Sequence, residues 1–152
     1  MAINRGKQFE GVVRESFERV PDCSVDRLHD QMTGFKGSQN ICDFVVYKCP
    51  YQFYIECKAV HGNTLPFSNI TSTQWDGLLK KSKITGVVAG VLCWWVDHDA
   101  TRFIPIKILD VRKQAGDKSI RYDVEDRNIK NIKGKKKRVF YEYDFKEFLN
   151  GF

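Results

Sequence analysis

The sequence predicts one α/β domain in which a mixed central sheet is flanked by helices. The chain has 152 residues, which is enough for a single hydrophobic core. Some segments carry apolar residues at helical spacing, whereas others alternate or run continuously as strands do. The two kinds of segment follow one another without a repeat or a linker. We therefore take residues 1–152 as a single domain, with a basic C-terminal extension from about residue 107.

The first half of the chain predicts one helix followed by strands. Residues 4–20 have the pattern of an amphipathic helix, and the proline that follows ends it. A short strand is expected at residues 25–28, before a loop that contains two glycines. Residues 41–47 and 52–59 predict two strands. Because only residues 48–51 separate these strands, we expect them to form a hairpin.

The second half predicts two more helices, two strands and a structured end. Residues 71–83 have helical periodicity, and residues 86–95 form an apolar run typical of a strand buried on both faces. A turn leads to a strand at residues 101–106. A helix is expected to open at Pro105 or Ile106 and to run to about residue 114. Residues 144–149 predict a short amphipathic segment near the C-terminus.

The composition argues against a membrane protein and against a disulfide-stabilised one. No apolar run is long enough to cross a bilayer, and the N-terminus has no hydrophobic signal core. We therefore expect a cytoplasmic protein with no membrane partner. The five cysteines are odd in number and form no C-x-x-C pair, which predicts reduced packing residues. A net charge of +6 modestly favours a polyanionic partner.

The predicted hairpin carries charged residues among its apolar ones. Side chains alternate along a strand, so Glu56 and Lys58 share one face. If residues 48–51 form the loop, Asp43 pairs with Glu56; the next allowed register places Asp43 opposite Lys58 instead. In both registers the three charged groups converge on one patch, with opposed Cβ atoms about 5 Å apart.

Two explanations of this patch follow from the residues alone. Two carboxylates at that distance repel by roughly 3 kcal/mol at an effective dielectric constant of about 20. Mg²⁺ would offset that repulsion, because it prefers hard oxygen ligands, and it could activate a water for phosphodiester hydrolysis. Lys58 could then orient the water or neutralise charge in the transition state. The alternative is an exposed ion pair on a strand edge, since E-x-K arises by chance in many charged chains.

The motifs, taken in order, resemble a known family. Asp43 followed by Glu56-Cys57-Lys58 is similar to the core of the PD-(D/E)xK nucleases. Within that superfamily, residues 4–106 most resemble the RecU-type Holliday-junction resolvases of Gram-positive bacteria and their phages. The further parts of the resemblance are Asn4-Arg5-Gly6, Phe9-Glu10, Asp43-Phe44, Leu65-Pro66-Phe67, Asn69-Ile70, Gln74, Thr85-Gly86 and Phe103-Ile104-Pro105.

The resemblance implies a restriction-endonuclease-like fold and a dimeric, Mg²⁺-dependent endonuclease, with Mn²⁺ as a substitute metal. Such an enzyme nicks paired strands of four-way DNA junctions during recombination or phage DNA processing, in a bacterial cell or a phage-infected host. The resemblance also implies that Asp43 and Glu56 bind the metal and that Lys58 assists catalysis. Glu10 and Gln74 match positions near the family's active site.

Two other kinds of function remain open. One is a restriction-like or repair endonuclease on the same fold that cuts linear or flapped DNA. The other is a non-catalytic nucleic-acid-binding module, against which the intact set of Asp43, Glu56 and Lys58 argues. Two of the implied residues also have structural alternatives. Glu10 can pair with Arg14 one helical turn on, and Gln74 has the spacing of a capping box with Thr71.

Basic residues at two places are candidate contacts for DNA phosphates. The first helix carries Arg5, Lys7 and Arg14. The run KGKKKR near the C-terminus contributes Lys135, Lys136, Lys137 and Arg138. A solvated helix face and a solvated loop are the structural alternatives for these two groups.

Overall fold

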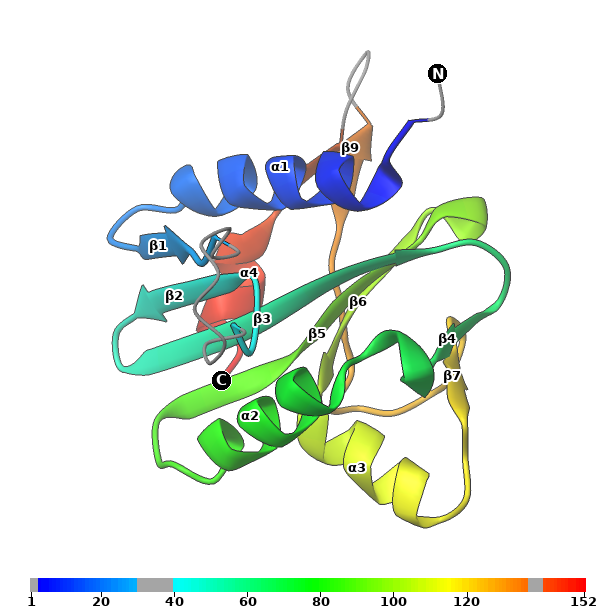
Figure 1. The fold of residues 1–152 in the computed structure, drawn as a ribbon. Helices are drawn as coiled ribbons and strands as arrows, with labels where there is room; N and C mark the ends of the chain where they lie inside the picture. Colours follow the sequence, from blue (N-terminus) through cyan, green and yellow to red (C-terminus); the bar gives the residue numbers. More distant parts are fainter. Residues whose placement is uncertain (1–2, 30–39, 137–140) are drawn as a thin grey trace.

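The structure is a computed structural model that describes residues 3–29, 40–136 and 141–152 (Figure 1). Its helices are α1 (Arg5–Glu18), α2 (Ser72–Ser82), α3 (Ile106–Gln114) and α4 (Phe145–Asn150), with short 3₁₀ helices at Phe67–Asn69 and Val96–His98. Its strands are β1 (Ser24–Arg27), β2 (Phe44–Lys48), β3 (Tyr51–Val60), β4 (Thr64–Pro66), β5 (Val87–Trp95), β6 (Ala100–Pro105), β7 (Ser119–Arg121), β8 (Lys130–Asn131), β9 (Gly134–Lys136) and β10 (Tyr141–Tyr143).

Six strands form the central sheet, in the order β1-β2-β3-β5-β6-β8. β3 and β5 run parallel, and the other neighbouring pairs are antiparallel. Two small sheets, β4 with β7 and β9 with β10, lie beside it. The mixed sheet flanked by helices that the sequence predicts is therefore confirmed.

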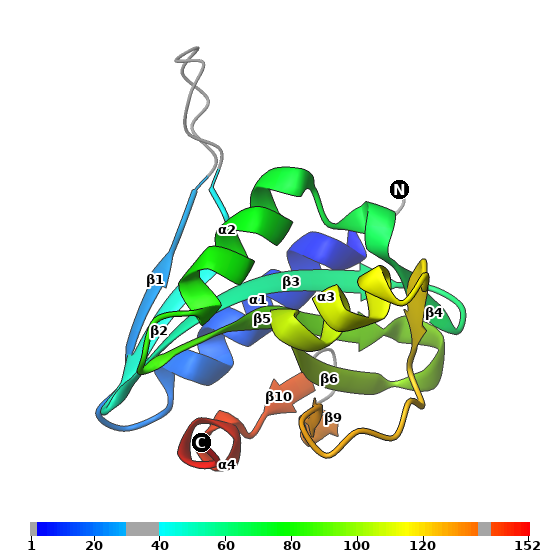
Figure 2. The same ribbon diagram turned by 90° about the horizontal axis from the view of Figure 1, so that it is seen from below.

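Helices cover both faces of the sheet (Figures 1 and 2). One apolar cluster joins α1 and α4 to one face, and Phe17 of α1 stacks on Phe145 with ring centroids 3.8 Å apart. A second cluster joins α2 and α3 to the other face through residues such as Trp75 and Leu109. Side chains on β3 alternate between the two clusters, so its two faces are both covered.

Local signals explain where the helices near the hairpin begin. The Asn4 side chain accepts a hydrogen bond from the amide of Lys7 and caps α1. α2 packs closely against the segment before β2, because a Cβ on Gly77 would lie 2.2 Å from Cγ2 of Ile41. A larger residue at position 77 would push α2 away from the start of the hairpin.

The chain after residue 107 packs into the same unit. β8 extends the central sheet by pairing with β6. Phe148 and Leu149 of α4 are buried in the cluster that also contains α1. All five cysteines are free thiols; Cys42, Cys57 and Cys93 are buried packing residues as predicted, whereas Cys23 is half-buried and Cys49 is exposed. Within the described residues, no helix is both long and apolar enough to span a bilayer.

Candidate active site at the β2–β3 hairpin

The β2–β3 hairpin brings the predicted acidic residues together. Phe44 pairs with Ile55, and the amide of Asp43 donates a 3.1 Å hydrogen bond to the carbonyl of Ile55. Asp43 therefore lies beside Glu56, which is the first of the two predicted registers. Lys58 follows on the same face of β3, and its Nζ is 3.9 Å from Oε1 of Glu56.

The turn of this hairpin is tighter than the sequence predicts. Lys48 and Tyr51 form the last ladder pair, so only Cys49 and Pro50 lie outside the strands. The register is unchanged by this difference, because Lys48 and Tyr51 continue the same alternation. The carboxylate of Asp43 is also fixed, since its Oδ2 accepts a 2.9 Å hydrogen bond from the amide of Cys57.

Glu56 is a buried acid on an interior strand. Its side chain is 4% exposed, and β3 lies between β2 and β5. The alternative of an exposed ion pair on a strand edge is therefore wrong. Oε2 of Glu56 is buried and has no hydrogen-bond partner among the described residues. A buried polar atom of this kind costs free energy unless something binds it.

The surroundings of Glu56 disfavour its charged form. Burial raises the pKa of Glu56 to about 9, and the adjacent Asp43 carboxyl contributes to the rise. The nearby charge of Glu10 raises this pKa further, whereas Lys58 lowers it. In the metal-free protein Glu56 therefore holds its proton at neutral pH, and a cation bound beside Asp43 and Glu56 would compensate the charge of the carboxylate form in a site where water is largely excluded. Such a site favours binding of a cation.

The residues at the hairpin fit a hard divalent cation. Carboxylate oxygens of Asp43 and Glu56 are the donors that Mg²⁺ prefers, and Oε2 of Glu56 has no competing partner. Among the described residues, no group of three or more His, Cys, Asp or Glu side chains could hold a metal ion. Mg²⁺ commonly uses one or two carboxylates and completes its coordination with water and substrate phosphate. The two carboxylates of Asp43 and Glu56 are therefore enough protein ligands for one Mg²⁺ ion.

Glu10 reaches this neighbourhood from α1. Its carboxylate forms an ion pair with Nη2 of Arg27 on β1, while Arg14 pairs with Glu18 at 3.9 Å. The charge of Glu10 acts on both Glu56 and Cys57 of β3, so the helix and the hairpin share one electrostatic site. Arg27 is not among the residues predicted from the sequence; its Nε is buried without a hydrogen-bond partner among the described residues.

Gln74 has the structural role that its spacing predicts. Its side-chain Oε1 accepts a hydrogen bond from the amide of Thr71, and its own amide donates to Oγ1 of Thr71. Both halves of the capping box are therefore present at the start of α2. A further role for Gln74 at the active site stays a prediction.

Basic side chains lie around α1 near the hairpin. Lys7 and Arg14 line a hollow of about 450 Å³ together with Glu10, Gly11 and Arg27. Arg5 donates a hydrogen bond to Gln8. In the C-terminal run, Lys135 is exposed on β9 and the backbone of Lys136 pairs with Tyr141. Lys137 and Arg138 lie outside the described residues.

Comparison with solved structures finds distant likenesses in fold. No protein-family model and no curated protein matches the chain. Among solved structures, Hjc from Archaeoglobus fulgidus, a Holliday junction resolvase from an archaeal hyperthermophile, is similar with a TM-score of 0.47 and 18% sequence identity. The similarity covers 67% of this chain and 77% of that one.

Proposed function

We propose that the chain is a metal-dependent endodeoxyribonuclease that resolves four-way (Holliday) junctions by paired nicks. The observation that carries the proposal is the buried Glu56 carboxyl beside Asp43 and Lys58, with Oε2 left without a partner among the described residues. A purely structural position would be better filled by an apolar residue, because burying an incompletely satisfied acid is unfavourable. A site that holds a cation explains why the acids are there.

Each residue of the hairpin has a distinct part in this chemistry. When bound, Mg²⁺ or Mn²⁺ supplies Lewis-acid stabilisation and a water of lowered pKa. Asp43, held by the Cys57 amide, and Glu56 would hold the ion. The ammonium group of Lys58 lies 3.9 Å from Glu56, and the lysine side chain is 20% exposed, so a scissile phosphate can approach it. There it orients the attacking water or neutralises charge that develops on the phosphate.

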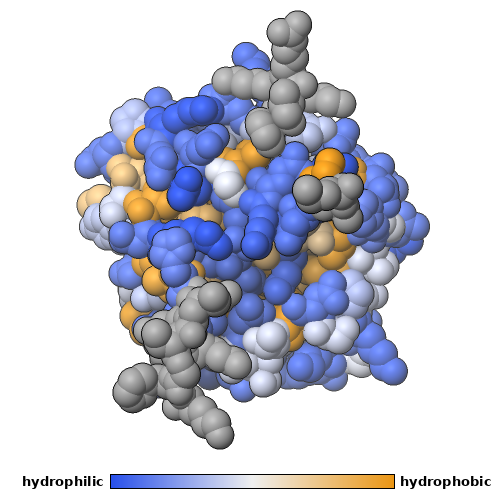
Figure 3. Space-filling view, turned by 45° about the horizontal axis from the view of Figure 1, so that its top comes forward, coloured by the Kyte–Doolittle hydropathy of each residue, from blue (hydrophilic) through white to orange (hydrophobic). Residues whose placement is uncertain are grey.

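The hollow beside α1 suits a DNA backbone. Lys7, Arg14 and Arg27 surround Glu10, and Glu10 acts electrostatically on Glu56. A DNA phosphate held by these basic side chains would place a neighbouring phosphodiester near the acids of the hairpin. The face of the molecule over α1 is mostly hydrophilic, as expected for a surface that contacts DNA (Figure 3).

We further propose a RecU-type enzyme, encoded by a phage, that acts as a homodimer. The motifs from Asn4 to Pro105 support the RecU assignment by their order. A four-way junction presents scissile strands related by a two-fold axis, and the hairpin supplies one acidic pair for each chain. Two coordinated cuts then require two copies in an isologous pairing.

A comparison of DNA substrates tests the function. The protein is incubated with Mg²⁺ or Mn²⁺ and with four-way junction, flap and linear duplex DNA of matched sequence, and the products are mapped. We expect symmetric paired nicks near the junction centre. Cleavage restricted to linear or flapped DNA would instead indicate a restriction-like or repair endonuclease. Binding without cleavage in either metal would indicate a non-catalytic module.

A further inference from the structure

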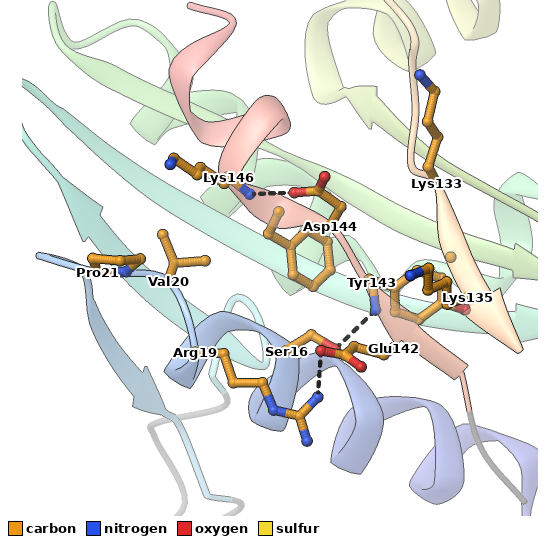
Figure 4. A pocket seen from close by; sticks show the side chains of 12 residues that line it. Ser16, Arg19, Val20, Pro21, Lys133, Lys135, Glu142, Tyr143, Asp144 and Lys146 are labelled. Atoms are coloured by element: carbon orange, nitrogen blue, oxygen red, sulfur yellow. Dashed lines mark hydrogen bonds and ion pairs between the residues drawn. The ribbon is translucent and has the colours of Figure 1, made fainter. Parts of the chain in front are cut away.

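A second basic hollow lies on the other flank of α1. It has a volume of about 470 Å³ and separates the C-terminal end of α1 from the β9–β10 ribbon and the start of α4 (Figure 4). Its basic side chains are those of Arg19, Lys133, Lys135 and Lys146. The hairpin site and the hollow around Arg27 do not share any of these residues.

Fixed contacts hold the walls of this hollow in place. The amide of Tyr143 donates a 3.1 Å hydrogen bond to Oγ of Ser16, and both residues are buried (Figure 4). Arg19 forms a 3.0 Å ion pair with Glu142 across the hollow. The ribbon and α1 are therefore tied together, so the basic side chains are presented from a rigid frame.

The lysines of the hollow remain available to a ligand. Lys135 and Lys146 are exposed and make no ion pair with any described residue. Lys133 is 3.9 Å from Glu147, but both side chains are more than 70% exposed, and such a surface pair adds little. Cations that are not committed to internal partners suit a phosphate backbone, which binds through counterion release.

An acidic ridge separates the two basic hollows. At 3.6 residues per turn, Lys7 and Arg14 lie on one flank of α1, and Ser16 and Arg19 lie on the other. Glu15 and Glu18 fall between them on the outer face, three residues apart; both are exposed, and Glu18 also pairs with Arg14 at 3.9 Å. A single duplex laid across both hollows would bring its phosphates against these carboxylates. Two separate duplexes avoid that repulsion.

We propose that the hollow formed by Arg19, Lys133, Lys135 and Lys146 binds the backbone of a second duplex arm of branched DNA. The hollow around Arg27 then receives the arm that is cut. This inference rests on the proposed function and names the structural basis of selectivity for branched over linear DNA. An arm on each flank of α1 requires a substrate whose duplexes diverge, as those of a four-way junction do.

The test measures binding in EDTA, so that cleavage does not interfere. The double variant Lys133→Gln/Lys146→Gln is compared with the wild-type protein on a four-way junction and on a linear duplex, at several salt concentrations. For the junction, we expect the slope of log affinity against log salt to flatten by about 1.8, from two lost phosphate contacts. The ratio of the junction affinity of the wild type to that of the variant should then fall roughly tenfold between about 50 and 200 mM salt. Binding of the duplex should change little.

A matched control removes the same charge elsewhere. Lys83→Gln/Lys107→Gln changes two exposed lysines, one at the end of α2 and one on α3, on the opposite side of the sheet. It should leave junction binding near the wild-type level. A thermal unfolding curve for each variant confirms that the fold is intact.

The remaining outcomes separate this inference from the proposed function. Equal weakening on junction and duplex would overturn the second-arm assignment, because one duplex would then span both hollows. A Lys133→Gln/Lys146→Gln variant that behaves like the control would overturn it as well. A wild-type protein that prefers junctions, loses the preference in the variant and yet cuts nothing with Mg²⁺ or Mn²⁺ would support this inference while refuting the nuclease proposal.

Discussion

Replacing Glu56 with Gln should change the pH dependence of folding stability. The folded pKa of Glu56 is about 9, against an ordinary value of 4.5. Between these two values the folded protein holds a proton that the unfolded chain releases. The free energy of unfolding therefore falls as pH rises, by about 1.4 kcal/mol per pH unit from this one group. Below pH 4.5 and above pH 9 the contribution is flat.

The size of the Glu56 contribution to the free energy of unfolding depends on the pH range that is compared. Between about pH 5.5 and 8.5 the Glu56 contribution amounts to about 4 kcal/mol. Glu56→Gln removes it, so in EDTA the stability of the variant relative to the wild type should rise by that amount across the window. The buried amide of Gln adds an offset of about 1–3 kcal/mol, but this offset does not depend on pH. The slope of the stability difference between variant and wild type against pH is thus the diagnostic quantity.

Urea unfolding at four pH values, with and without Mn²⁺, provides the assay. Mn²⁺ binds the carboxylate form and should stabilise the wild type most at high pH, following RT ln(1 + [L]/Kd), while leaving Glu56→Gln unchanged. Glu125→Gln, at an exposed position, serves as the control and should follow the wild type. Parallel pH profiles for the wild type and Glu56→Gln would show that the pKa of Glu56 is not raised in the folded protein. Equal stabilisation of both proteins by Mn²⁺ would show that Glu56 does not hold the ion.

Three further predictions concern the site and its partners. Lys58→Ala should lower the rate of junction cleavage by at least a hundredfold while changing Mn²⁺ affinity less than tenfold, if its ammonium group acts on the phosphate as we propose; comparable losses in both would assign Lys58 to metal binding. Lys135→Gln should flatten the salt dependence of junction binding by about 0.9, and an unchanged slope would show that Lys135 is merely solvated. Heterodimers of wild-type and Asp43→Asn subunits should nick one strand of a junction; paired cuts by such heterodimers, or by a protein that sediments as a monomer on DNA, would refute the dimer.

The hairpin could be predicted from the sequence because its determinants are local. Alternation along the strands and the short connection predict that Asp43 and Glu56 lie together in either allowed register, and the pairing of β2 with β3 confirms the first of the two. The N-cap residues Asn4 and Thr71, which precede α1 and α2, are also local signals. The resemblance to the nuclease family pointed to the same residues.

Other features depend on long-range packing, which local patterns do not encode. The burial of Glu56 follows from the parallel pairing of β3 with β5, a pairing between distant segments. Arg27 meets Glu10 across 17 positions of sequence, and a four-residue strand with Asp26 next to Arg27 gives no sign of that contact. β8 is only two residues long, too short for any periodicity to reveal that it extends the sheet.

Whether Asp43 and Glu56 hold a metal ion for DNA cleavage can be measured on one pair of proteins. Wild type and Asp43→Asn are titrated with Mn²⁺ by calorimetry and, in the same buffer, assayed on a labelled four-way junction. We expect the variant to bind the junction as the wild type does, to lose most of its Mn²⁺ affinity and to cut nothing detectable. Cleavage by Asp43→Asn at a rate near that of the wild type would contradict the assignment.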